Sequence, residues 1–401
     1  ESGAATVADM QNVAAIVSRF HAEAPSTTYI SAFGTPEKIL YNWNENFEQL
    51  IPFEASTLHA SDREAIRSWV SAFVESNGDL FNRRVEQGFI RECDGDLHLE
   101  NICLVDDRVY IFDCIEFNER FRFCDTAADI AFLLMDLDFH NRSDLADAVT
   151  AAYHSESGDA DLPQLIDFYK VYRAVVRGKV ESFRLNDSGI SREDREMAQR
   201  RAVRYFRLAR GYIERLRLHP TLFITCGTMG CGKSTLAEQL AFELGIKSFN
   251  SDYIRKKIAG LPPETAVREE YGQGLYTESI SGKTYEGLGR LAECELAAGH
   301  SVIIDASFRH SAERTGFAEL AALRQSGFVI LLVSCSPGEQ KRRLKARAES
   351  GPSISDGRAD LLELQKADFD FPSETEGKII AISSMHRPEH LTSMVYRGLQ
   401  R

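Results

Sequence analysis

Residues 227–234 read Gly227-Thr228-Met229-Gly230-Cys231-Gly232-Lys233-Ser234, which is a glycine, four further residues and then Gly-Lys-Ser. The apolar run TLFITC at 221–226 precedes it and is typical of a buried strand. Residues 235–244 follow with the apolar spacing of a helix. A strand, a glycine turn and a helix in this order present backbone N–H groups and a helix N-terminus to an anion. The stretch therefore predicts a phosphate-binding loop, or P-loop, for ATP or GTP.

Within this loop each residue type suits a role at a nucleotide. Residues 227–235, ending in Thr235, are predicted to surround the phosphates. Lys233 would reach the β- and γ-phosphates, and the Ser234 hydroxyl would hold Mg²⁺. The helix N-terminus and Lys233 would favour a thiolate at Cys231, so that oxidation or alkylation would block phosphate entry. The alternative is that Cys231 is only a small residue tolerated at a variable position.

The rest of the second half alternates between apolar strands and helical segments. Strands are predicted at residues 247–250, 301–304, 328–334 and 378–382, with a helix at about 276–299. This alternation is typical of a parallel, doubly wound α/β sheet. We expect a P-loop domain over residues 220–401, with His219-Pro220 marking its boundary.

Polar residues at the ends of these strands suit phosphoryl transfer, which needs a metal, positioning and charge neutralisation. Asp305 ends an apolar strand, where a carboxylate would hold the Mg²⁺. Asp252 follows the second strand beside the P-loop and is the candidate general base, with Arg255 one helical turn further on to clamp the acceptor. Arg343 and Arg347, four residues apart before a polar stretch, suit a lid that meets the phosphates. The simpler alternatives are an ordinary strand-terminal Asp, a helix cap beside a surface Arg, and a solvated helix face.

The segments GTMGCGKST, SDYIRKKIAG and SVIIDASF, in this order, resemble the P-loop small-molecule kinases of the gluconate kinase, zeta-toxin and predicted-kinase group. The resemblance covers about 180 residues, from Thr221 to the last residue. It implies ATP-dependent phosphorylation of a hydroxyl on a small molecule. Polynucleotide 5′-kinases share the Asp-x-x-Arg, so nucleic-acid ends remain an alternative acceptor. A nucleotide-binding regulatory module is the alternative from another class.

The first half contains Asp94-Gly95-Asp96-Leu97-His98-Leu99-Glu100-Asn101, which resembles the catalytic loop of aminoglycoside phosphotransferases and related kinase-like folds. The resemblance implies that Asp96 is the base and that Asn101 and Asp113 are Mg²⁺ ligands. Asp94 stands where that family has a His. The pattern predicts a mainly helical, kinase-like C-lobe over residues 1–215, joined as in two-domain bacterial kinase/ATPases. Whether this half is catalytic or an inert scaffold stays open.

A kinase-like fold also needs a β-rich N-lobe with a lysine for the α- and β-phosphates. Before Asp94 the single lysine is Lys38, which lies in a helical context without a glycine-rich hairpin. The sequence therefore predicts either a piece of a longer protein or a lobe that has been lost. It also predicts that residues 1–215 alone transfer no phosphate.

Composition sets outer limits on the function. The 401 residues are 43% hydrophobic and 27% charged, with a net charge of −13 that disfavours broad nucleic-acid binding. No apolar run reaches a membrane span, no export signal is visible, and the eight scattered cysteines lack a C-x-x-C pair. We expect a cytoplasmic protein without structural zinc or membrane contact. The Arg-rich segment 195–217 is interpreted as a solvated linking helix, with a partner surface as the alternative.

Overall fold

The computed structural model describes residues 5–105, 108–262, 265, 269–270, 272–349 and 357–400. The chain divides into two compact units, Glu1–Leu216 and Arg217–Arg401, and each is described by itself. Asp106-Asp107-Arg108 separates two short apolar runs, which predicts a tight hairpin turn. Asp106 and Asp107, and most of the polar stretch before Gly357, lie outside the described residues. Within the described ranges, no helix combines the length and the apolar character needed to cross a bilayer.

The second unit is built on one five-stranded parallel sheet. Its strands are β5 (Thr221–Cys226), β6 (Lys247–Asn250), β7 (Val302–Asp305), β8 (Gly327–Ser334) and β9 (Lys378–Ser383), in the spatial order β6-β7-β5-β8-β9. The P-loop strand β5 is central, and β7 lies between it and β6. All carboxyl ends therefore meet at one edge, where ligands bind in open α/β sheets.

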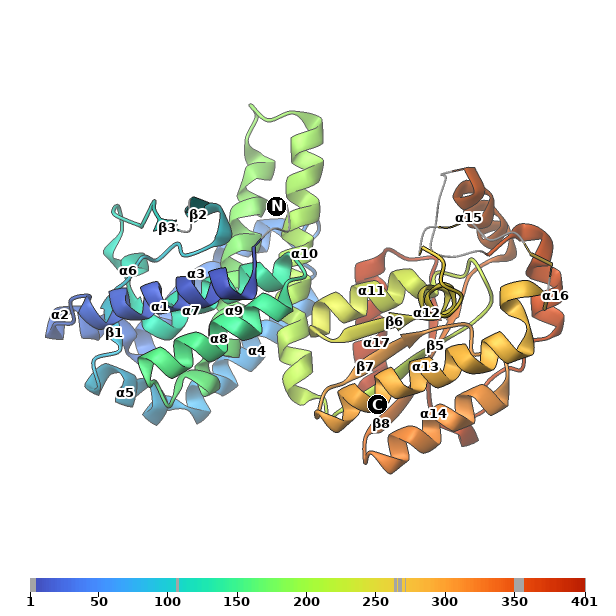
Figure 1. Ribbon diagram of the computed structural model, residues 1–401. Helices are drawn as coiled ribbons and strands as arrows, with labels where there is room; N and C mark the ends of the chain where they lie inside the picture. The colour runs from blue at the N-terminus through green and yellow to red at the C-terminus, as the bar shows by residue number, and fades with distance from the viewer. Residues whose placement is uncertain are drawn as a thin grey trace. The chain divides into compact units, whose positions relative to one another are not determined.

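Helices cover both faces of this sheet (Figure 1). Alternate strand residues point to opposite faces, so the neighbours Leu222 and Phe223 enter different cores. The helices α11 (Lys233–Leu244) and α17 (Pro388–Leu399) pack on one face, and α12 (Ser251–Ile258), α13 (Glu278–Ala297) and α14 (Ser311–Leu323) pack on the other. The remaining helices are α15 (Pro337–Glu349) and α16 (Leu362–Ala367). The predicted doubly wound parallel sheet is confirmed.

The first unit is mainly helical. Its helices are α1 (Val7–Glu23), α2 (Thr28–Ser31), α3 (Pro36–Leu50), α4 (Ala60–Ser76), α5 (Gly78–Glu86), α6 (Glu119–Arg122), α7 (Thr126–Phe139), α8 (Ser143–Ser157), α9 (Leu162–Phe183) and α10 (Arg192–Arg217). Two antiparallel pairs join β1 (Ile90–Glu92) to β4 (Phe123–Asp125) and β2 (Ile102–Val105) to β3 (Arg108–Ile111). Helix α7 is buried along almost its whole length and forms the centre of this unit.

The Arg-rich helix α10 is not the solvated linker that its sequence indicated. Tyr205, Phe206 and Tyr212 are buried in it. Arg207 and Arg210 are also buried, and both lie near the carboxylate of Asp62. Because long arginine side chains can bury their stems while their charges are paired, a basic sequence does not require a solvated helix.

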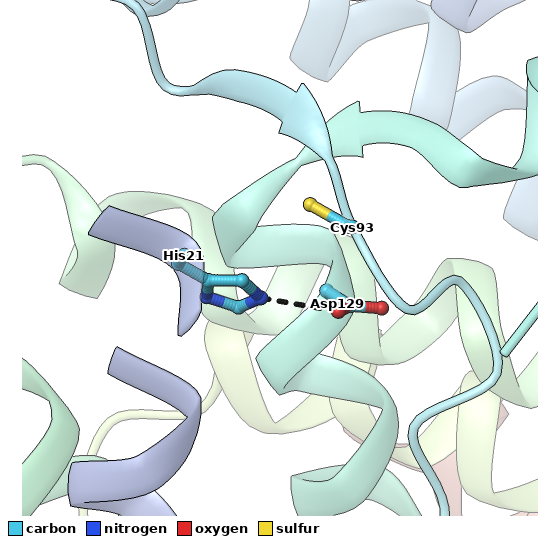
Figure 2. A group of neighbouring side chains, drawn as sticks. All are labelled: His21, Cys93 and Asp129. Atoms are coloured by element: carbon cyan, nitrogen blue, oxygen red, sulfur yellow. Dashed lines mark hydrogen bonds and ion pairs between the residues drawn. The ribbon is translucent and has the colours of Figure 1, made fainter. Parts of the chain in front are cut away.

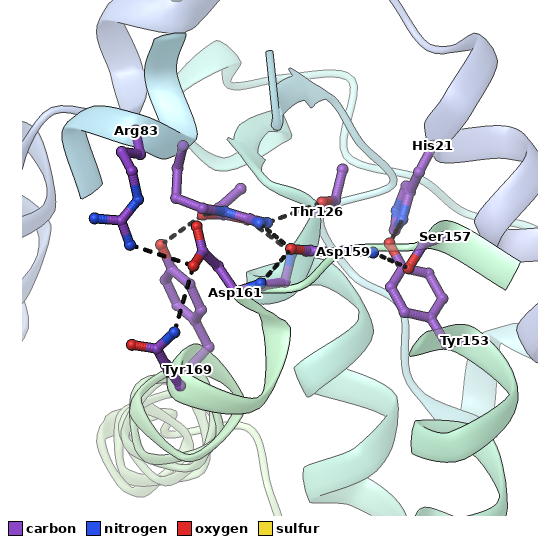
Figure 3. Close-up of polar contacts among 12 residues, drawn as sticks. His21, Arg83, Thr126, Tyr153, Ser157, Asp159, Asp161 and Tyr169 are labelled. Carbon is purple, nitrogen blue, oxygen red and sulfur yellow. Dashed lines mark hydrogen bonds and ion pairs between the residues drawn. The ribbon is translucent and has the colours of Figure 1, made fainter. Parts of the chain in front are cut away.

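A buried charge network joins α5 to the start of α7. The fully buried guanidinium of Arg84 donates to Asp125 at 2.6 and 3.0 Å and to Asp159 at 2.5 Å. Asp125 also caps α7 by accepting from the Ala127 N–H. Figure 3 shows Asp159 and, at the edge of the network, Asp161 with Arg83. The network fixes the β1–β4 pair against the helical core.

Replacing Arg84 with methionine is therefore expected to lower the free energy of unfolding of the first unit by about 3–5 kcal/mol, because two buried carboxylates lose their partner. Urea titration can follow this, since both tryptophans of the chain, Trp43 and Trp69, lie in this unit. Arg83→Met is the matched control, because its half-exposed ion pair with Asp161 is worth below about 1 kcal/mol. Equal losses for both variants would contradict the account.

Candidate active site

The P-loop follows β5 and ends at the first turn of α11. Gly227, Gly230 and Gly232 all have positive φ angles, of 148°, 75° and 97°. A Cβ on Gly227 would lie 2.4 Å from the carbonyl oxygen of Val333, and one on Gly230 would lie 2.8 Å from the Leu344 side chain. Glycine is therefore required for both the turn and the close packing of the loop against β8 and α15.

Two glutamines from later helices hold the loop. Gln340 Nε2 donates to Thr228 Oγ1 at 2.7 Å and to the Met229 carbonyl at 2.6 Å. Gln365 Oε1 accepts from the Met229 N–H at 2.6 Å. Both side chains are buried. A phosphate that uses the Met229 N–H would have to displace Gln365.

Lys233 begins α11 and points back across the loop. Its Nζ donates to the Thr228 carbonyl at 2.9 Å and lies 4.0 Å from the sulfur of Cys231. Cys231 itself is buried, and burial raises the pKa of its thiol although the charge of Lys233 lowers it. The predicted thiolate is therefore wrong, because desolvation outweighs the nearby cation.

Iodoacetamide is consequently expected to label Cys231 slowly, at a rate that ATP and Mg²⁺ do not change. The exposed Cys294 of the same unit serves as the control and should react readily. Peptide mass spectrometry can compare the two sites. Rapid labelling of Cys231 that ATP suppresses would restore the reactive-thiol interpretation.

Asp305 lies at the carboxyl end of β7, next to the P-loop strand. Its Oδ1 accepts from Thr225 Oγ1 at 3.0 Å, and its Oδ2 accepts from Asn250 Nδ2 at 2.7 Å. The side chain is buried, and these two contacts fix its orientation. Each carboxylate oxygen keeps a further lone pair that a cation or its water shell can use.

Asp252 and Arg255 lie on the first turns of α12, after β6. Asn250 caps this helix by accepting from the Asp252 N–H at 2.9 Å. Arg255 Nη1 donates to Asp252 Oδ1 at 2.7 Å, and its guanidinium lies over the ring of Tyr276. The two predicted partners are therefore in contact. Their strand is the edge strand β6, which β7 separates from β5, so Asp252 reaches the P-loop from one strand further away than expected.

The two arginines predicted for a lid, Arg343 and Arg347, point to different places. Arg347 lines the cavity at the P-loop, as does Arg358. Arg343 turns away: it donates to Glu339 and to the hydroxyl and carbonyl of Ser384, and its Nη1 lies 3.5 Å from the Cys231 carbonyl. These donors brace the loop from behind, and the role of Arg343 as a phosphate ligand stays a prediction.

These residues surround one cavity of about 170 Å³ at the carboxyl edge of the sheet. Its wall contains Met229, Gly230, Gly232, Lys233, Ser234, Thr235, Asp252, Arg255, Asp305 and Arg347. Gly227, Thr228 and Cys231 are not among the lining residues and instead shape the loop. The structure thus brings the phosphate-binding loop together with Asp252, Asp305 and several arginines at a single site.

The first unit places Asp96, Asn101 and Asp113 near one another. Asn101 Nδ2 donates to the Asp96 carbonyl at 3.1 Å and to Asp96 Oδ2 at 3.3 Å. Asp96 and Asp113 line one cavity of about 490 Å³. Burial raises the pKa of Asp96, but the hydrogen bond and charge of His98 and the charges of two arginines outweigh it and hold the pKa below its ordinary value. The metal-binding roles of these residues remain predictions.

The loop that carries Asp96 is held by Asp129 of α7. Both Asp129 oxygens accept backbone N–H groups, from Asp94 at 3.1 Å and from Gly95 at 2.9 Å. His21 Nε2 lies 3.1 Å from Asp129, and His21 Nδ1 lies 2.7 Å from the Tyr153 hydroxyl (Figures 2 and 3). Tyr153, His21 and Asp129 thus form a buried chain that ends at the loop backbone.

Figure 2 also shows Cys93 beside this pair, and the three ligand atoms lie within 4.8 Å of one another. Such a group could hold a metal ion. However, both nitrogens of His21 and both oxygens of Asp129 already make hydrogen bonds, and burial raises the pKa of Cys93 far above its usual range. We therefore interpret the group as a hydrogen-bonded support for the loop.

Asp94 gives this loop a measurable pH dependence. Burial, reinforced by the charge of Asp129, raises the pKa of Asp94 to about 6. The folded protein then binds more protons than the unfolded chain between about pH 4 and 6, so stability falls as the pH rises through that window. At pH 8 the free energy of unfolding of Asp94→Asn is expected to exceed that of the wild type by about 1–3 kcal/mol. The difference should shrink as the pH falls toward 4, where the wild-type carboxyl is also neutral.

Denaturant titrations at several pH values can test this. Asp96→Asn serves as a control with the opposite sign, because the pKa of the wild-type Asp96 carboxyl is lowered. The ionised Asp96 therefore stabilises the fold at neutral pH, and this stabilisation is lost as the pH falls. A stabilisation by Asp94→Asn that is the same at every pH would contradict the assigned titration.

The sequence analysis did not identify several residues that support the two sites. His21 and Tyr153 lie more than 100 residues apart, and no local pattern connects them. Gln340 and Gln365 are likewise distant from the P-loop in sequence. Thr225 and Asn250 carried a weak signal, since each is a polar residue at or near the end of a strand that leads to the site.

Comparisons with known proteins show which family the chain belongs to. A family model described as AAA domain (AAA_33) matches residues 222–372. The uncharacterized protein Rv2004c of Mycobacterium tuberculosis is 31% identical over 358 residues, which cover 89% of this chain and 70% of that protein. This chain belongs to the family of that mycobacterial protein. The uncharacterized protein Mb2027c of Mycobacterium bovis matches with the same identity and coverage. Because 358 residues exceed either unit alone, the family relationship includes residues of both.

Two solved structures are each similar to less than half of the chain. A sugar kinase from Janibacter sp. HTCC2649 is 20% identical, with a TM-score of 0.34, and the match covers 45% of this chain and 95% of that one. A gluconokinase from Sinorhizobium meliloti 1021 is 21% identical, with a TM-score of 0.33, and the match covers 46% and 94%. The assignment of the second unit as a P-loop domain rests on its own loop, sheet and family match.

Proposed function

We propose that the second unit is a nucleotide-dependent kinase that phosphorylates a hydroxyl of a small molecule. The observation that carries this proposal is the single cavity shared by Lys233, Ser234, Asp252, Arg255 and Asp305. Lys233 and Ser234 would be needed by any protein that binds a nucleotide at this loop. A carboxylate paired with an arginine beside them is what an acceptor hydroxyl requires.

In the proposed reaction, the acceptor oxygen forms a bond to the γ-phosphorus and the bond to the β–γ bridging oxygen breaks. Asp252 takes the proton of the acceptor hydroxyl, and the leaving nucleoside diphosphate keeps the bridging oxygen. Lys233 donates to the phosphates once it leaves the Thr228 carbonyl. Arg255 holds Asp252 in place through their 2.7 Å contact. Arg347 and Arg358 on the cavity wall balance charge that develops on the γ-phosphoryl group.

The residues fit a magnesium ion. Mg²⁺ prefers oxygen ligands, and Ser234 and Asp305 line the same cavity as Lys233. Thr225 and Asn250 donate hydrogen bonds to Asp305 and fix the orientation of its carboxylate. Metal ligands are commonly oriented by hydrogen bonds of this kind. Ser234 and Asp305 would hold the ion, directly or through its water shell. When bound, the ion would neutralise charge on the β- and γ-phosphates.

The first experiment measures ADP release by the full chain with defined hydroxylated small molecules added one at a time. The proposal expects release that depends on one class of acceptor and saturates with it. A 5′-hydroxyl oligonucleotide forms a separate arm, because Asp252 and Arg255 also suit that acceptor. ADP release that no small molecule increases would overturn the proposal.

A further inference from the structure

The first unit contains a cavity of about 630 Å³ that the nucleotide site does not involve. Its wall is formed by α3, α6, α7 and α9 and by the loop that carries Asp96. This volume is in the range of small-molecule binding sites, which are typically a few hundred to about 1,000 Å³. Because every lining residue belongs to the first unit, the cavity is independent of the function proposed for the second.

Much of this wall is aromatic. The rings include Trp43, Phe121, Phe123, Phe132, Tyr169 and Tyr172. Trp43 and Tyr172 meet edge to face at 5.2 Å, which keeps both rings ordered at the cavity. Flat apolar bodies pack well among such rings, and the burial of apolar area would supply most of the binding free energy.

Lys179 gives the cavity a buried positive charge without a directly bound carboxylate among the described residues. Its Nζ donates to Asn46 Oδ1 at 2.6 Å and to Gln49 Oε1 at 2.9 Å, and the residue is only 8% exposed. Both hydrogen-bond partners are neutral, and the Nζ also lies 5.7 Å from the centroid of the Phe183 ring. The Glu45 carboxylate attracts this ammonium without a direct contact among the described residues, and the charge of Arg120 opposes that attraction. Burial lowers the pKa of Lys179 because desolvation disfavours the charged ammonium, and the charge of Glu45 only partly opposes this.

The other charged groups of the wall are already paired. Arg120 binds Glu45 with both Nη atoms, at 2.6 and 3.3 Å. Arg173 donates to the carbonyls of Ala128 and Gly95. An ammonium group has three N–H donors, and Lys179 uses two of them. The third has no hydrogen-bond acceptor among the described residues, so an anionic group entering the cavity would gain both a hydrogen bond and an opposite charge.

Asp96 is the remaining charged wall residue that offers an acceptor. Its carboxylate contacts His98 and Asn101 and is 37% exposed, so its oxygens are still open to a donor. The Asn42 Oδ1 and Trp43 Nε1 atoms on the α3 side are buried and have no hydrogen-bond partner in the described part of the chain. The wall therefore offers one cation, one carboxylate and polar atoms of both kinds around an apolar interior.

From this arrangement we propose that the cavity binds a small molecule with an aromatic or similarly flat body, a carboxylate and a hydroxyl. The carboxylate accepts from the free N–H of Lys179. The body packs among Trp43, Phe132 and Tyr172, and the hydroxyl donates to Asp96. Cationic ligands are rejected, because they would place a second positive charge beside a buried ammonium.

The test uses intrinsic fluorescence of the full chain. Trp69→Phe leaves Trp43, on the cavity wall, as the only tryptophan. The probes are 3-(4-hydroxyphenyl)propanoate, its uncharged primary amide, and the amine of the same length, 3-(4-hydroxyphenyl)propylamine. The expected result is saturable quenching by the carboxylate, with the amide at least roughly tenfold weaker and the amine without effect.

Lys179→Met in the Trp69→Phe background should weaken binding of the carboxylate at least roughly tenfold and reduce its preference over the amide. Circular dichroism and thermal unfolding check that this variant folds. If it does not fold, the ranking of the three probes on the parent protein still decides the question. Tighter binding of the amine, equal binding of carboxylate and amide, or no binding of the carboxylate at millimolar concentration would each overturn the proposal.

Discussion

Lys233→Ala is expected to lower the rate of phosphoryl transfer by about 10²–10³-fold, because one preorganised charge at the phosphates is lost. Affinity for ATP should also fall, since the ammonium contributes to binding before reaction. In the structure Lys233 Nζ bridges the loop to the Thr228 carbonyl at 2.9 Å, and the P-loop glycines hold that carbonyl in place. The lysine is thus ordered at the loop and needs little rearrangement to reach a phosphate.

Calorimetry with ATP and Mg²⁺, together with single-turnover transfer rates, measures both effects. Lys247→Ala is the matched control: this lysine begins β6, is 65% exposed and pairs with Glu295. It lies at the amino end of its strand, away from the carboxyl edge that carries the cavity. If the Lys233→Ala variant bound ATP as tightly as the wild type, the nucleotide site would be misplaced.

Asp252→Asn is expected to reduce transfer by about 10²–10⁴-fold, the usual contribution of a general base, while ATP affinity changes little. Asparagine has the same shape and can still accept from Arg255 through its amide oxygen. The variant therefore removes proton acceptance and leaves the contact between α12 and the cavity in place. A parallel loss of ATP affinity would indicate a positioning role for Asp252 instead.

The control for this change is Glu293→Gln, another carboxylate-to-amide replacement in the second unit. Glu293 lies on α13, is 39% exposed and pairs with Arg324, outside the cavity. Its rate should equal that of the wild type. Single-turnover rates at saturating ATP separate the chemical step from binding in all three proteins.

The sequence was most informative where the site is contiguous. The P-loop, its strand and its helix lie within 24 residues (221–244), so one local pattern identified them. Asp305 was found because a carboxylate at the end of an apolar strand is visible without knowing the strand order. The strand order itself was not visible, and for that reason β7 was not expected between β5 and β6.

The differences between the sequence-based expectations and the structure at Cys231 and Arg343 share a physical cause, which is contact with distant segments of the chain. The neighbours of Cys231 in the sequence show a cation and a helix N-terminus, but the core that buries the thiol comes from β8 and β9 and from helix α17. The spacing of Arg343 and Arg347 places both on one helix face. Arg343, however, donates a hydrogen bond to the distant Ser384.

The most direct test of the proposed kinase activity uses ATP labelled in its γ-phosphoryl group and a mixture of hydroxylated metabolites. Mass spectrometry of the products follows the label with the wild type and with Asp252→Asn. The account predicts a labelled phosphate ester with the wild type and at least a hundredfold less with Asp252→Asn. Tight ATP binding with label released only as inorganic phosphate, at equal rates in both proteins, would contradict it and favour a nucleotide-binding regulatory module.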